Sequence, residues 1–405
     1  MSEHLAWLDS LQGSGIRPGL DRMRAVLRAL GRPERAYPSI IVAGTNGKGS
    51  TSATLASILT TSGYKTGLYT SPHLVDLRER WMINGAMIEA AMLDSSIEIL
   101  RRASEKIGIT PTYFEALTLI AFIAFREVRC ELAVLEVGMG GRLDATNVVR
   151  PIAALITPIG LDHMEFLGTT LRKVAAEKAG VIHRGTIVLT TNSDPIALDV
   201  LRRRAKKFGD RLIVVHDDHA TPLLGDFQRR NVALAVRAAR ELRPTLRRIT
   251  SKSIERGVVQ TRWRGRLERI NIHGKSIWID GLHNAHAAAA VAPFIDKNVA
   301  SPRLLVFGIM RDKDIEAVAR ILFSRFDRVI TTEPYPPRSA NAEELAAVAL
   351  RMNVESAAEP QPARAFELAM RSPQRSVFIG GSLYLAGAAI EYFDAQRKRS
   401  NKKQK

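Results

Sequence analysis

A glycine-rich stretch around one lysine is the part of this sequence with the clearest chemistry. Residues 40–51 read I-I-V-A-G-T-N-G-K-G-S-T, so an apolar run ends in three glycines spaced around Lys48, and hydroxyl residues follow. Glycines let backbone N–H groups approach an anion closely, and a helix that begins here adds its dipole to the charge of Lys48. Ser50 or Thr51 can place a hydroxyl on a phosphate-bound Mg²⁺.

The stretch therefore predicts a phosphate-binding P-loop, with the hydroxyl one residue later than in the common form. An ordinary glycine-rich turn is the alternative, but it does not explain why strand, loop, lysine and helix occur in the required order. The residues predicted to bind nucleotide phosphate are Gly44, Thr45, Asn46, Gly47, Lys48, Gly49 and Ser50.

A second group of residues suggests a metal ion. Glu136 lies in the apolar run V-L-E-V, and burying a carboxylate without a partner costs several kcal/mol. A metal ion held by some of Ser50, Ser71, Glu136 and His163 would supply the partner. Mg²⁺ prefers oxygen ligands, so His163 indicates a second ion site that tolerates nitrogen. The alternatives are a structural ion pair for Glu136 and a capping or core role for His163.

Lys178 lies in what we expect to be the last helical turn before Gly180. A cation at this position interacts favourably with the helix dipole, and from the residues alone this is the preferred interpretation.

The C-terminal part of the chain carries a second set of polar residues. The motif D-G-L-H-N-A places Asp280 and His283 at the end of an expected strand, where Asp280 suits a ribose or an ammonium and His283 a phosphate or a base edge. The segment T-R-W-R-G-R carries Arg262, Arg264 and Arg266, one of which can stabilise a transferring phosphoryl group. Spacing does not choose among the three, and all of them can also be solvated linker charges.

The elements that position these residues alternate between strands and helices. This alternation predicts an α/β protein with mostly parallel sheets: a P-loop ATPase domain over residues 1–262 and a smaller Rossmann-like domain over residues 263–396. The unusual polar clusters fall just after expected strands, where open α/β sheets bind their ligands, and this favours a cleft between two domains. The clusters are residues 44–50, 71–73, 136–147, 162–163, 280–284 and 310–314.

Composition limits the remaining classes. The chain has 405 residues, 46% hydrophobic and 25% charged, with a formal net charge of +18. The positive residues are spread out except in residues 397–405, which we interpret as a disordered, solvated tail, so a nucleic-acid partner is not expected. The single cysteine, Cys130, excludes an intrachain disulfide. No apolar run is long enough to span a bilayer and the first residues lack a signal-peptide core, so we expect no membrane partners. The single cysteine favours reducing, cytoplasmic conditions, and we also expect a monomer.

Eight motifs in order give the chain a family resemblance. They are G-T-N-G-K-G-S, T-S-P-H-L, L-E-V-G-M-G-G-R-L-D-A-T-N, D-H-M-E-F-L-G, A-E-K-A-G, W-R-G-R-L-E, D-G-L-H-N-A and G-S-L-Y. With these motifs the chain resembles the folylpolyglutamate synthase and dihydrofolate synthase family of the Mur ligase superfamily, from about residue 8 to residue 393. The resemblance implies an ATP-dependent amide ligase: a pterin carboxylate takes the γ-phosphoryl group of ATP, and the amino group of L-glutamate attacks the acyl phosphate.

The resemblance also implies roles for single residues. Lys178 matches a lysine that the family carries as a carbamate, an anion that can hold Mg²⁺, which reverses the helix-dipole interpretation. Arg266 is the linker cation that matches, with Arg264 as a second candidate, and Lys48, His163, Lys178 and Arg266 form the expected catalytic set. The implied magnesium ligands are Ser50, Ser71, Glu136, His163 and Lys178. The implied ATP contacts outside the loop are Asn231, Arg266, Asp280 and His283. The implied pterin region is Gly19, Leu20, Arg22, Phe114, Gly141, Arg142 and Asp144.

The sequence departs from the family pattern in its linker. The family motif usually reads W-P-G-R, whereas here Arg264 takes the place of the proline. Without the proline we expect a less stiff segment. Leu282 and Ala285 also replace a common alanine and proline around His283.

Two other functions remain as alternatives. A muramyl-type ligase acting on a UDP-sugar peptide is disfavoured, because few residues precede the P-loop. A P-loop nucleic-acid ATPase is disfavoured because basic and aromatic residues are not interleaved.

The segment G-I-R-P-G-L-D-R resembles the dihydropteroate-binding region of bifunctional members of the family. We therefore expect the protein to add glutamate both to dihydropteroate and to folate.

Overall fold

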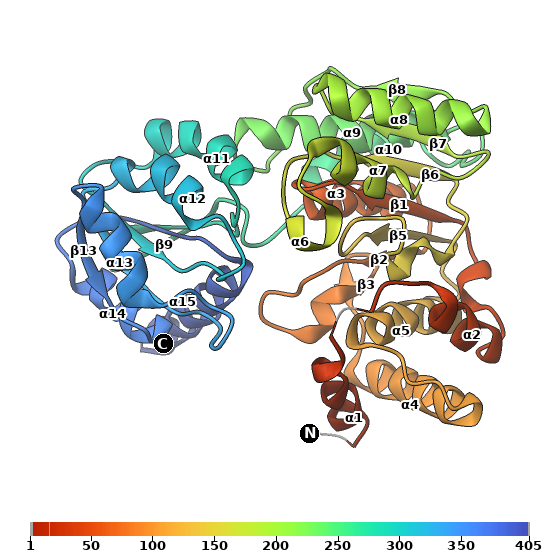
Figure 1. The fold of residues 1–405 in the computed structure, drawn as a ribbon, viewed down its shortest axis with the longest axis horizontal. Helices are drawn as coiled ribbons and strands as arrows, with labels where there is room; N and C mark the ends of the chain where they lie inside the picture. The colour runs from red at the N-terminus through yellow and green to blue at the C-terminus, as the bar shows by residue number, and fades with distance from the viewer. Residues whose placement is uncertain (1–2, 16, 404–405) are drawn as a thin grey trace. The chain divides into compact units, whose positions relative to one another are not determined.

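The computed structural model describes residues 3–15 and 17–403, and these form two compact units. Unit 1 contains residues up to 72, residues 78–222 and residues 228–262. Unit 2 contains residues 73–77, 223–227 and 263 onward. In Figure 1 each unit is a sheet with helices packed around it.

Unit 1 is built on an eight-stranded sheet in the order β4-β3-β2-β5-β1-β6-β7-β8. The pairs β2–β3 and β3–β4 are antiparallel, and all the other neighbours are parallel. The central strand β1 is S-I-I-V-A and is buried throughout, as expected for a strand covered on both faces. The strands are β1 (Ser39–Ala43), β2 (Thr66–Tyr69), β3 (Trp81–Ile83), β4 (Ala86–Met87), β5 (Leu132–Glu136), β6 (Ala153–Ile156), β7 (Ile187–Thr190) and β8 (Leu212–Val214).

The helices of unit 1 pack on this sheet and on one another. Helix α3 contacts β1, β2 and β5, and α10 packs on α3; α5 contacts β2, and α4 packs on α5. Thr112 and Glu115 form a capping box that starts α5. The α-helices of unit 1 are α1 (Glu3–Ser10), α2 (Asp21–Ala29), α3 (Lys48–Thr61), α4 (Ala90–Ile107), α5 (Tyr113–Glu127), α6 (Met164–Leu167), α7 (Leu171–Ala179), α8 (Pro195–Phe208), most of α9 (Asp226–Leu242) and α10 (Ser251–Gln260). Short 3₁₀ turns are η1 (Leu11–Ser14), η2 (Pro33–Arg35), η3 (Leu77–Arg80), which crosses the unit boundary, and η4 (Ala145–Val148).

Unit 2 has a six-stranded sheet in the order β13-β12-β11-β14-β10-β9, parallel except for the β9–β10 hairpin. Strand and helix alternate along the chain, which gives the parallel crossovers of a Rossmann-like unit. The strands are β9 (Glu268–Ile272), β10 (Lys275–Ile279), β11 (Arg303–Phe307), β12 (Arg328–Thr331), β13 (Glu355–Ala358) and β14 (Ser376–Gly380). The helices are α11 (Ala285–Asn298), α12 (Ile315–Leu322), η5 (Phe323–Arg325), α13 (Ala342–Arg351), α14 (Pro362–Arg371) and α15 (Leu383–Lys403).

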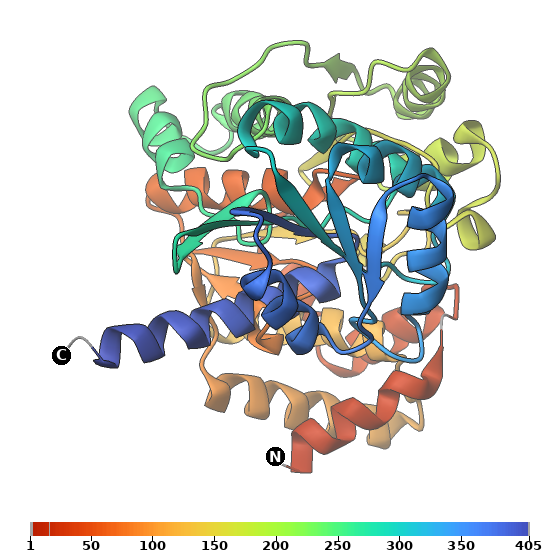
Figure 2. The same cartoon turned by 90° about the vertical axis from the view of Figure 1, so that its left-hand side faces the viewer.

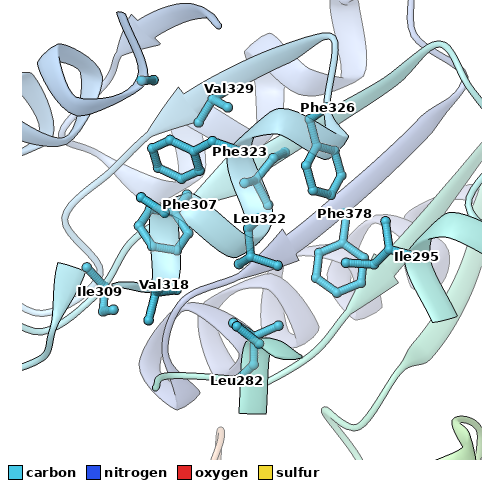
Figure 3. Packing of buried hydrophobic residues seen from close by; sticks show 14 of the residues in the cluster. Leu282, Ile295, Phe307, Ile309, Val318, Leu322, Phe323, Phe326, Val329 and Phe378 are labelled. Carbon is cyan, nitrogen blue, oxygen red and sulfur yellow. The ribbon is translucent and has the colours of Figure 1, made fainter. Parts of the chain in front are cut away.

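An aromatic core lies on one side of the unit 2 sheet (Figure 3). The rings of Phe307 and Phe323 meet edge to face, with centroids 5.0 Å apart. Leu282 is 2% exposed and belongs to this core. Because Leu282 stands inside the motif D-G-L-H-N-A, burying its side chain anchors the polar residues on either side of it.

The end of the chain differs from our expectation. We expected a disordered tail over residues 397–405, but α15 continues to Lys403, and residues 404–405 lie outside the described residues. Figure 2 shows the last turns of α15 extending past the sheet of unit 2. The residues A-Q-R-K-R are strong helix formers, so the helix propagates although it has no apolar face there.

The predicted fold class is confirmed: both units are α/β with mostly parallel sheets. Among the described helices, none combines the length and the apolar character that crossing a membrane requires.

Candidate active site

The phosphate loop lies between β1 and α3, as the sequence predicts. Gly47 caps α3 with φ 88°, and Gly44 has φ 142°, both of which favour glycine. A Cβ atom on Gly44 would lie 1.8 Å from Oγ1 of Thr157, and one on Gly47 would lie 2.3 Å from Oδ1 of Asn231. Glycine is therefore required at both positions by packing as well as by backbone conformation.

Hydrogen bonds hold the loop against the segment that follows β6. Thr45 N donates to Pro158 O at 3.0 Å, and the Thr45 hydroxyl donates to Gly160 O at 2.9 Å and accepts from Gly160 N at 3.0 Å. Lys48 Nζ donates to the carbonyls of Gly44 and Thr45, at 3.3 and 3.1 Å. The loop is thus preformed, with its lysine folded over it.

Lys178 also reaches this loop. Its side chain is buried, with 4% exposed, and Nζ lies 2.7 Å from the Gly44 carbonyl oxygen. Burial, followed by the neighbouring charge of Lys48, lowers the pKa of the Lys178 amine from 10.5 to about 7. A lysine that served only the dipole of its own helix would reach the last carbonyls of α7, so this geometry disfavours that interpretation.

The loop after β5 supports the turn of α7 that carries Lys178. Arg142 N donates to Glu177 O at 2.8 Å, and the Arg142 guanidinium pairs with the Glu177 carboxylate at 2.9 Å. A Cβ atom on Gly141 would lie 2.9 Å from Glu177 O, and one on Gly180 would lie 2.4 Å from Arg142 Cα. Gly141 and Arg142, expected to contact a pterin, are therefore packed against α7.

Asp144 organises the same loop from inside. Its carboxylate accepts from Met139 N at 2.9 Å, Thr146 N at 3.0 Å and Thr146 Oγ1 at 2.6 Å. Burial raises the pKa of Asp144, and these hydrogen bonds oppose the rise. Asp144 therefore fixes the conformation of the loop by accepting hydrogen bonds from Met139 and Thr146.

Two of the proposed metal ligands follow neighbouring parallel strands. Glu136 ends β5 and is 5% exposed, and one of its carboxylate oxygens accepts from Ser71 N at 3.2 Å, just after β2. Ser50 lies in the first turn of α3 and is also buried. Buried carboxylate and hydroxyl oxygens are the donor type that Mg²⁺ prefers, so these residues fit a magnesium ion.

His163 is exposed and has φ 49° at the start of the short helix α6. Its backbone N–H donates to Asp162 Oδ1 at 2.9 Å. Within residues 3–15 and 17–403, no three His, Cys, Asp or Glu side chains gather closely enough to hold a metal ion. Side chains of these four types alone therefore do not form a metal site in the described part of the chain.

Arg22 and Phe114 lie on α2 and α5. Arg22 forms two hydrogen bonds with the buried Glu115 carboxylate, at 3.1 and 3.2 Å. The Phe114 ring packs on Gly138, where a Cβ atom would lie 2.3 Å from Cζ. Gly19 has φ 130° and Leu20 is buried just before α2, so both shape the entry to that helix.

Asn231 is hydrogen-bonded to Gln228, a residue that we did not predict for the site. Its Nδ2 donates to Gln228 Oε1 at 3.0 Å, one turn earlier on α9, and both side chains are buried. Among the described residues, Nε2 of Gln228 is a buried donor without a partner. The spacing Q-x-x-N on one helix face was the available signal for this pair.

In unit 2 the predicted residues lie together around Gly281. Asp280 accepts from Leu267 N at 2.9 Å and from Leu282 N at 2.8 Å, so its carboxylate holds backbone. Burial raises the pKa of Asp280, and the charge of Arg266 opposes this. A Cβ atom on Gly281 would lie 2.7 Å from Nη1 of Arg266. His283 Nδ1 lies 2.9 Å from Gly281 O.

Taken together, the parallel sheets and the phosphate loop define a two-unit nucleotide-binding α/β protein. Residues 42–234 match the Mur ligase middle domain, and residues 265–383 match the Mur ligase glutamate ligase domain. The chain belongs to the Mur ligase family, in the group of the dihydrofolate synthases and folylpolyglutamate synthases. The predicted family is therefore confirmed.

Relatives match over almost the whole chain. The dihydrofolate synthase/folylpolyglutamate synthase of Bacillus subtilis is 32% identical, over 94% of this chain and 96% of the relative. The folylpolyglutamate synthase of Lacticaseibacillus casei is 32% identical, over 91% and 92%. The structure of Escherichia coli FolC in complex with DHPP and ADP superposes with a TM-score of 0.86 at 30% identity, covering 98% of this chain and 99% of that one.

Proposed function

We propose that this protein is an ATP-dependent ligase that adds L-glutamate both to dihydropteroate and to reduced folate. The class of enzyme, an amide-bond-forming ATP ligase, follows from the family. The observation that carries the proposal is the 2.7 Å contact between Lys178 Nζ and the Gly44 carbonyl. It brings a buried lysine of lowered pKa to the phosphate loop.

The reaction proceeds in two steps, phosphoryl transfer and amide formation. An oxygen of the pterin substrate's carboxylate attacks the γ-phosphorus of ATP, and the bond to ADP breaks. The glutamate amine then attacks the acyl carbon, phosphate leaves with the bonding electron pair, and the amine loses one proton. The loop N–H groups and Lys48 stabilise the charge of the transferring phosphoryl group.

Mg²⁺ would be held by Ser50, Ser71 and Glu136, with His163 at a second ion, and it supplies charge neutralisation on the nucleotide phosphates. Lys178, as a carbamate, would join these ligands. Its neutral amine attacks carbon dioxide, and the new carbamic acid loses a proton to give an anion. A pKa of about 7 makes the neutral amine available at physiological pH.

Residues 1–262 then bind ATP and the pterin, and residues 263–396 form the glutamate ligase domain. Phe114 offers its ring to the pterin, and Gly19, Leu20 and Arg22 shape the same region. Gly141, Arg142 and Asp144 border the pterin from the loop after β5, which also packs against α7. Gln228 joins the ATP contacts, which in unit 2 are Arg266, Asp280 and His283.

Measured ADP release tests the activity. The purified protein receives Mg-ATP and L-glutamate, with dihydropteroate in one tube and reduced folate in another. Release in both, with the glutamylated product identified by mass, is expected. Release in one tube alone contradicts bifunctionality, and release in neither, with ATP still bound, contradicts the choice of acceptor.

The alternatives have their own readouts. A muramyl-type ligase releases ADP with a UDP-sugar peptide, and a nucleic-acid ATPase shows salt-dependent retention on DNA. We expect neither. We also propose that the protein acts as a cytoplasmic monomer, and a dimer mass in size-exclusion chromatography with light scattering would contradict that.

A further inference from the structure

Arg264 forms ion pairs with two carboxylates of unit 2, those of Glu268 and Asp394. Its Nη1 donates to Asp394 Oδ2 at 2.7 Å and its Nη2 donates to Glu268 Oε1 at 2.7 Å. Further hydrogen bonds join Nε to Glu268 at 3.1 Å and Nη2 to Asp394 at 3.3 Å. The planar guanidinium therefore binds two carboxylates at once, an arrangement with well-defined geometry.

These carboxylates belong to elements that are far apart in the sequence. Glu268 begins β9, and Asp394 lies in α15. Glu268 also accepts from Gly265 N at 2.9 Å, so it holds the backbone next to Arg264. A Cβ atom on Gly265 would lie 3.0 Å from Leu74 Cδ1, which shows how closely this segment packs. Residues 264 and 265 are thus held to both the sheet and the last helix.

The segment is held on its other side by the D-G-L-H-N-A motif. Leu267 N donates to Asp280 at 2.9 Å, and Gly281 N donates to Gly265 O at 2.9 Å. Arg266 lies between these two anchored stretches, with its Nη1 donating to Gly265 O at 2.8 Å. The direction of the Arg266 side chain therefore depends on how firmly residues 264 and 265 are held.

The covalent structure does not restrain the backbone at position 264, because arginine leaves φ free where a proline would fix it. Gly265, with φ 64°, adopts a conformation that favours glycine. The ion pairs to Glu268 and Asp394 therefore add a side-chain restraint to the backbone hydrogen bonds that hold residues 265–267.

We propose that Arg264 is a positioning residue: its ion pairs with Glu268 and Asp394 hold the backbone next to Arg266 and so fix the direction of the Arg266 side chain, one of the ATP contacts of the proposed function. This proposal rests on the proposed function, because it assumes that Arg266 meets the nucleotide. It also gives the enzyme a sensitivity that a proline linker lacks. The Arg264 side chain is 47% exposed, so salt screens its ion pairs and loosens Arg266.

Kinetics of single and double variants test the proposal. We expect Arg264→Ala to lower kcat/KM for ATP about tenfold, and Arg264→Lys, which lacks the fork, to lower it about threefold. In the Arg266→Ala background the Arg264→Ala change should cost less than about twofold, since there is no longer a guanidinium to position. A full tenfold loss in that background overturns the proposal, and so does wild-type activity of Arg264→Ala.

Arg264→Pro is the complementary variant. The backbone of Arg264 is not in the left-handed region, so proline is compatible there in that respect. We expect this variant to keep activity within about twofold and to lose less activity between 50 and 500 mM salt than the wild type does. Equal salt dependence in the two proteins contradicts the role of the ion pairs.

Asp394→Asn serves if Arg264→Ala does not fold, because it removes one ion pair alone. This variant should also lower kcat/KM, and an unchanged kcat/KM overturns the proposal.

The matched control is Arg351→Ala. Arg351 also forms an exposed ion pair in unit 2, with Glu316 at 2.9 Å, but on α13. It should leave kcat/KM and its salt dependence unchanged. Affinity for ADP, measured by calorimetry, keeps the test separate from the proposed acceptor chemistry. If no glutamate acceptor is turned over but Arg264→Ala still weakens ADP binding only while Arg266 is present, the proposed function fails and the positioning role stands.

Discussion

Lys178 and Lys48 converge on one carbonyl oxygen, that of Gly44, at 2.7 and 3.3 Å. Two ammonium groups this close repel one another, and Lys178 is the more deeply buried of the two. Its amine is therefore the one that burial and repulsion push toward the neutral form. A neutral amine at a phosphate loop is a nucleophile rather than a counter-ion, which is the chemical basis of the carbamate proposal.

The first prediction concerns pH. Since the pKa of Lys178 is about 7, the amine is mostly protonated at pH 6 and mostly neutral at pH 8. At fixed dissolved carbon dioxide, carbamate formation and turnover should both rise as pH increases through about 7. The measurement is the ¹³C NMR signal of protein incubated with ¹³C-bicarbonate, beside kcat/KM from pH 6 to 9. A missing carbamate signal at pH 8 would refute the modification.

The second prediction is chemical rescue. Lys178→Ala should lose at least about 100-fold in turnover, because the variant lacks the amine that would form the proposed carbamate ligand of the metal ion. Acetate or formate in the assay should restore part of the activity by supplying a carboxylate in the vacated space. Lys173→Ala, an exposed lysine on the same helix α7, is the control and should need no rescue. Full activity of Lys178→Ala without added carboxylate would return Lys178 to the helix-dipole interpretation.

The third prediction separates stability from activity. The pKa of Lys178 is about 7 when folded and 10.5 ordinarily, so the unfolded chain binds more protons between these values. The free energy of unfolding should therefore rise with pH across this window. Below pH 7 the buried amine is protonated, so the folded protein carries the full free-energy cost of burying the charge. Lys178→Met should stabilise the nucleotide-free protein at pH 7 by on the order of 3 kcal/mol, after the lost hydrogen bond is deducted. Urea unfolding without carbon dioxide measures it, and the gain should fade toward pH 10; a loss of stability at pH 7 would contradict the buried-amine argument.

These lysine contacts show where sequence reasoning reaches its limit. The position of the phosphate loop between β1 and α3 was predicted correctly. This was possible because the strand, the glycines and the helix are contiguous in the sequence, so local sequence determines all three. The contact between Lys178 and Gly44 joins residues 134 positions apart and depends on how α7 packs on the sheet. From its own neighbours Lys178 is only a lysine near a helix end, and the resemblance alone indicated more.

The loop after β5 shows the opposite case. Its glycines and charges were expected to meet a substrate, and that stays a prediction. In the structure Gly141 packs on α7, Arg142 pairs with Glu177, and Asp144 accepts hydrogen bonds from Met139 N and from the backbone and hydroxyl of Thr146. A motif signals that residue types are constrained at fixed spacing, but it does not say whether a ligand or the fold imposes the constraint. Only the packing distinguishes the two.

The fourth prediction tests the phosphate loop. Lys48→Ala removes the cation that faces the transferring phosphoryl group, so turnover should fall at least about 100-fold. Within the described residues, the hydrogen bonds of the Lys48 ammonium go to carbonyls of its own loop, so the melting temperature should change little. ADP release and thermal unfolding of the same sample give both numbers. Normal turnover would remove the phosphate-loop assignment, and a collapse of the melting temperature would show that Lys48 is structural.

The fifth prediction asks whether Arg22 binds substrate or holds the fold. The Glu115 side chain is only 6% exposed, and Arg22 is its ion-pair partner. Arg22→Ala should thus destabilise the protein by about 3 kcal/mol, since it leaves a buried carboxylate without its cation. In the Glu115→Gln background the same change should cost much less stability, because no buried charge remains to be paired. Denaturant unfolding of the four proteins measures the coupling, and KM for dihydropteroate is measured beside it. If Arg22 instead contacts the pterin, the rise in KM will persist in the Glu115→Gln background while the stability cost is small in both.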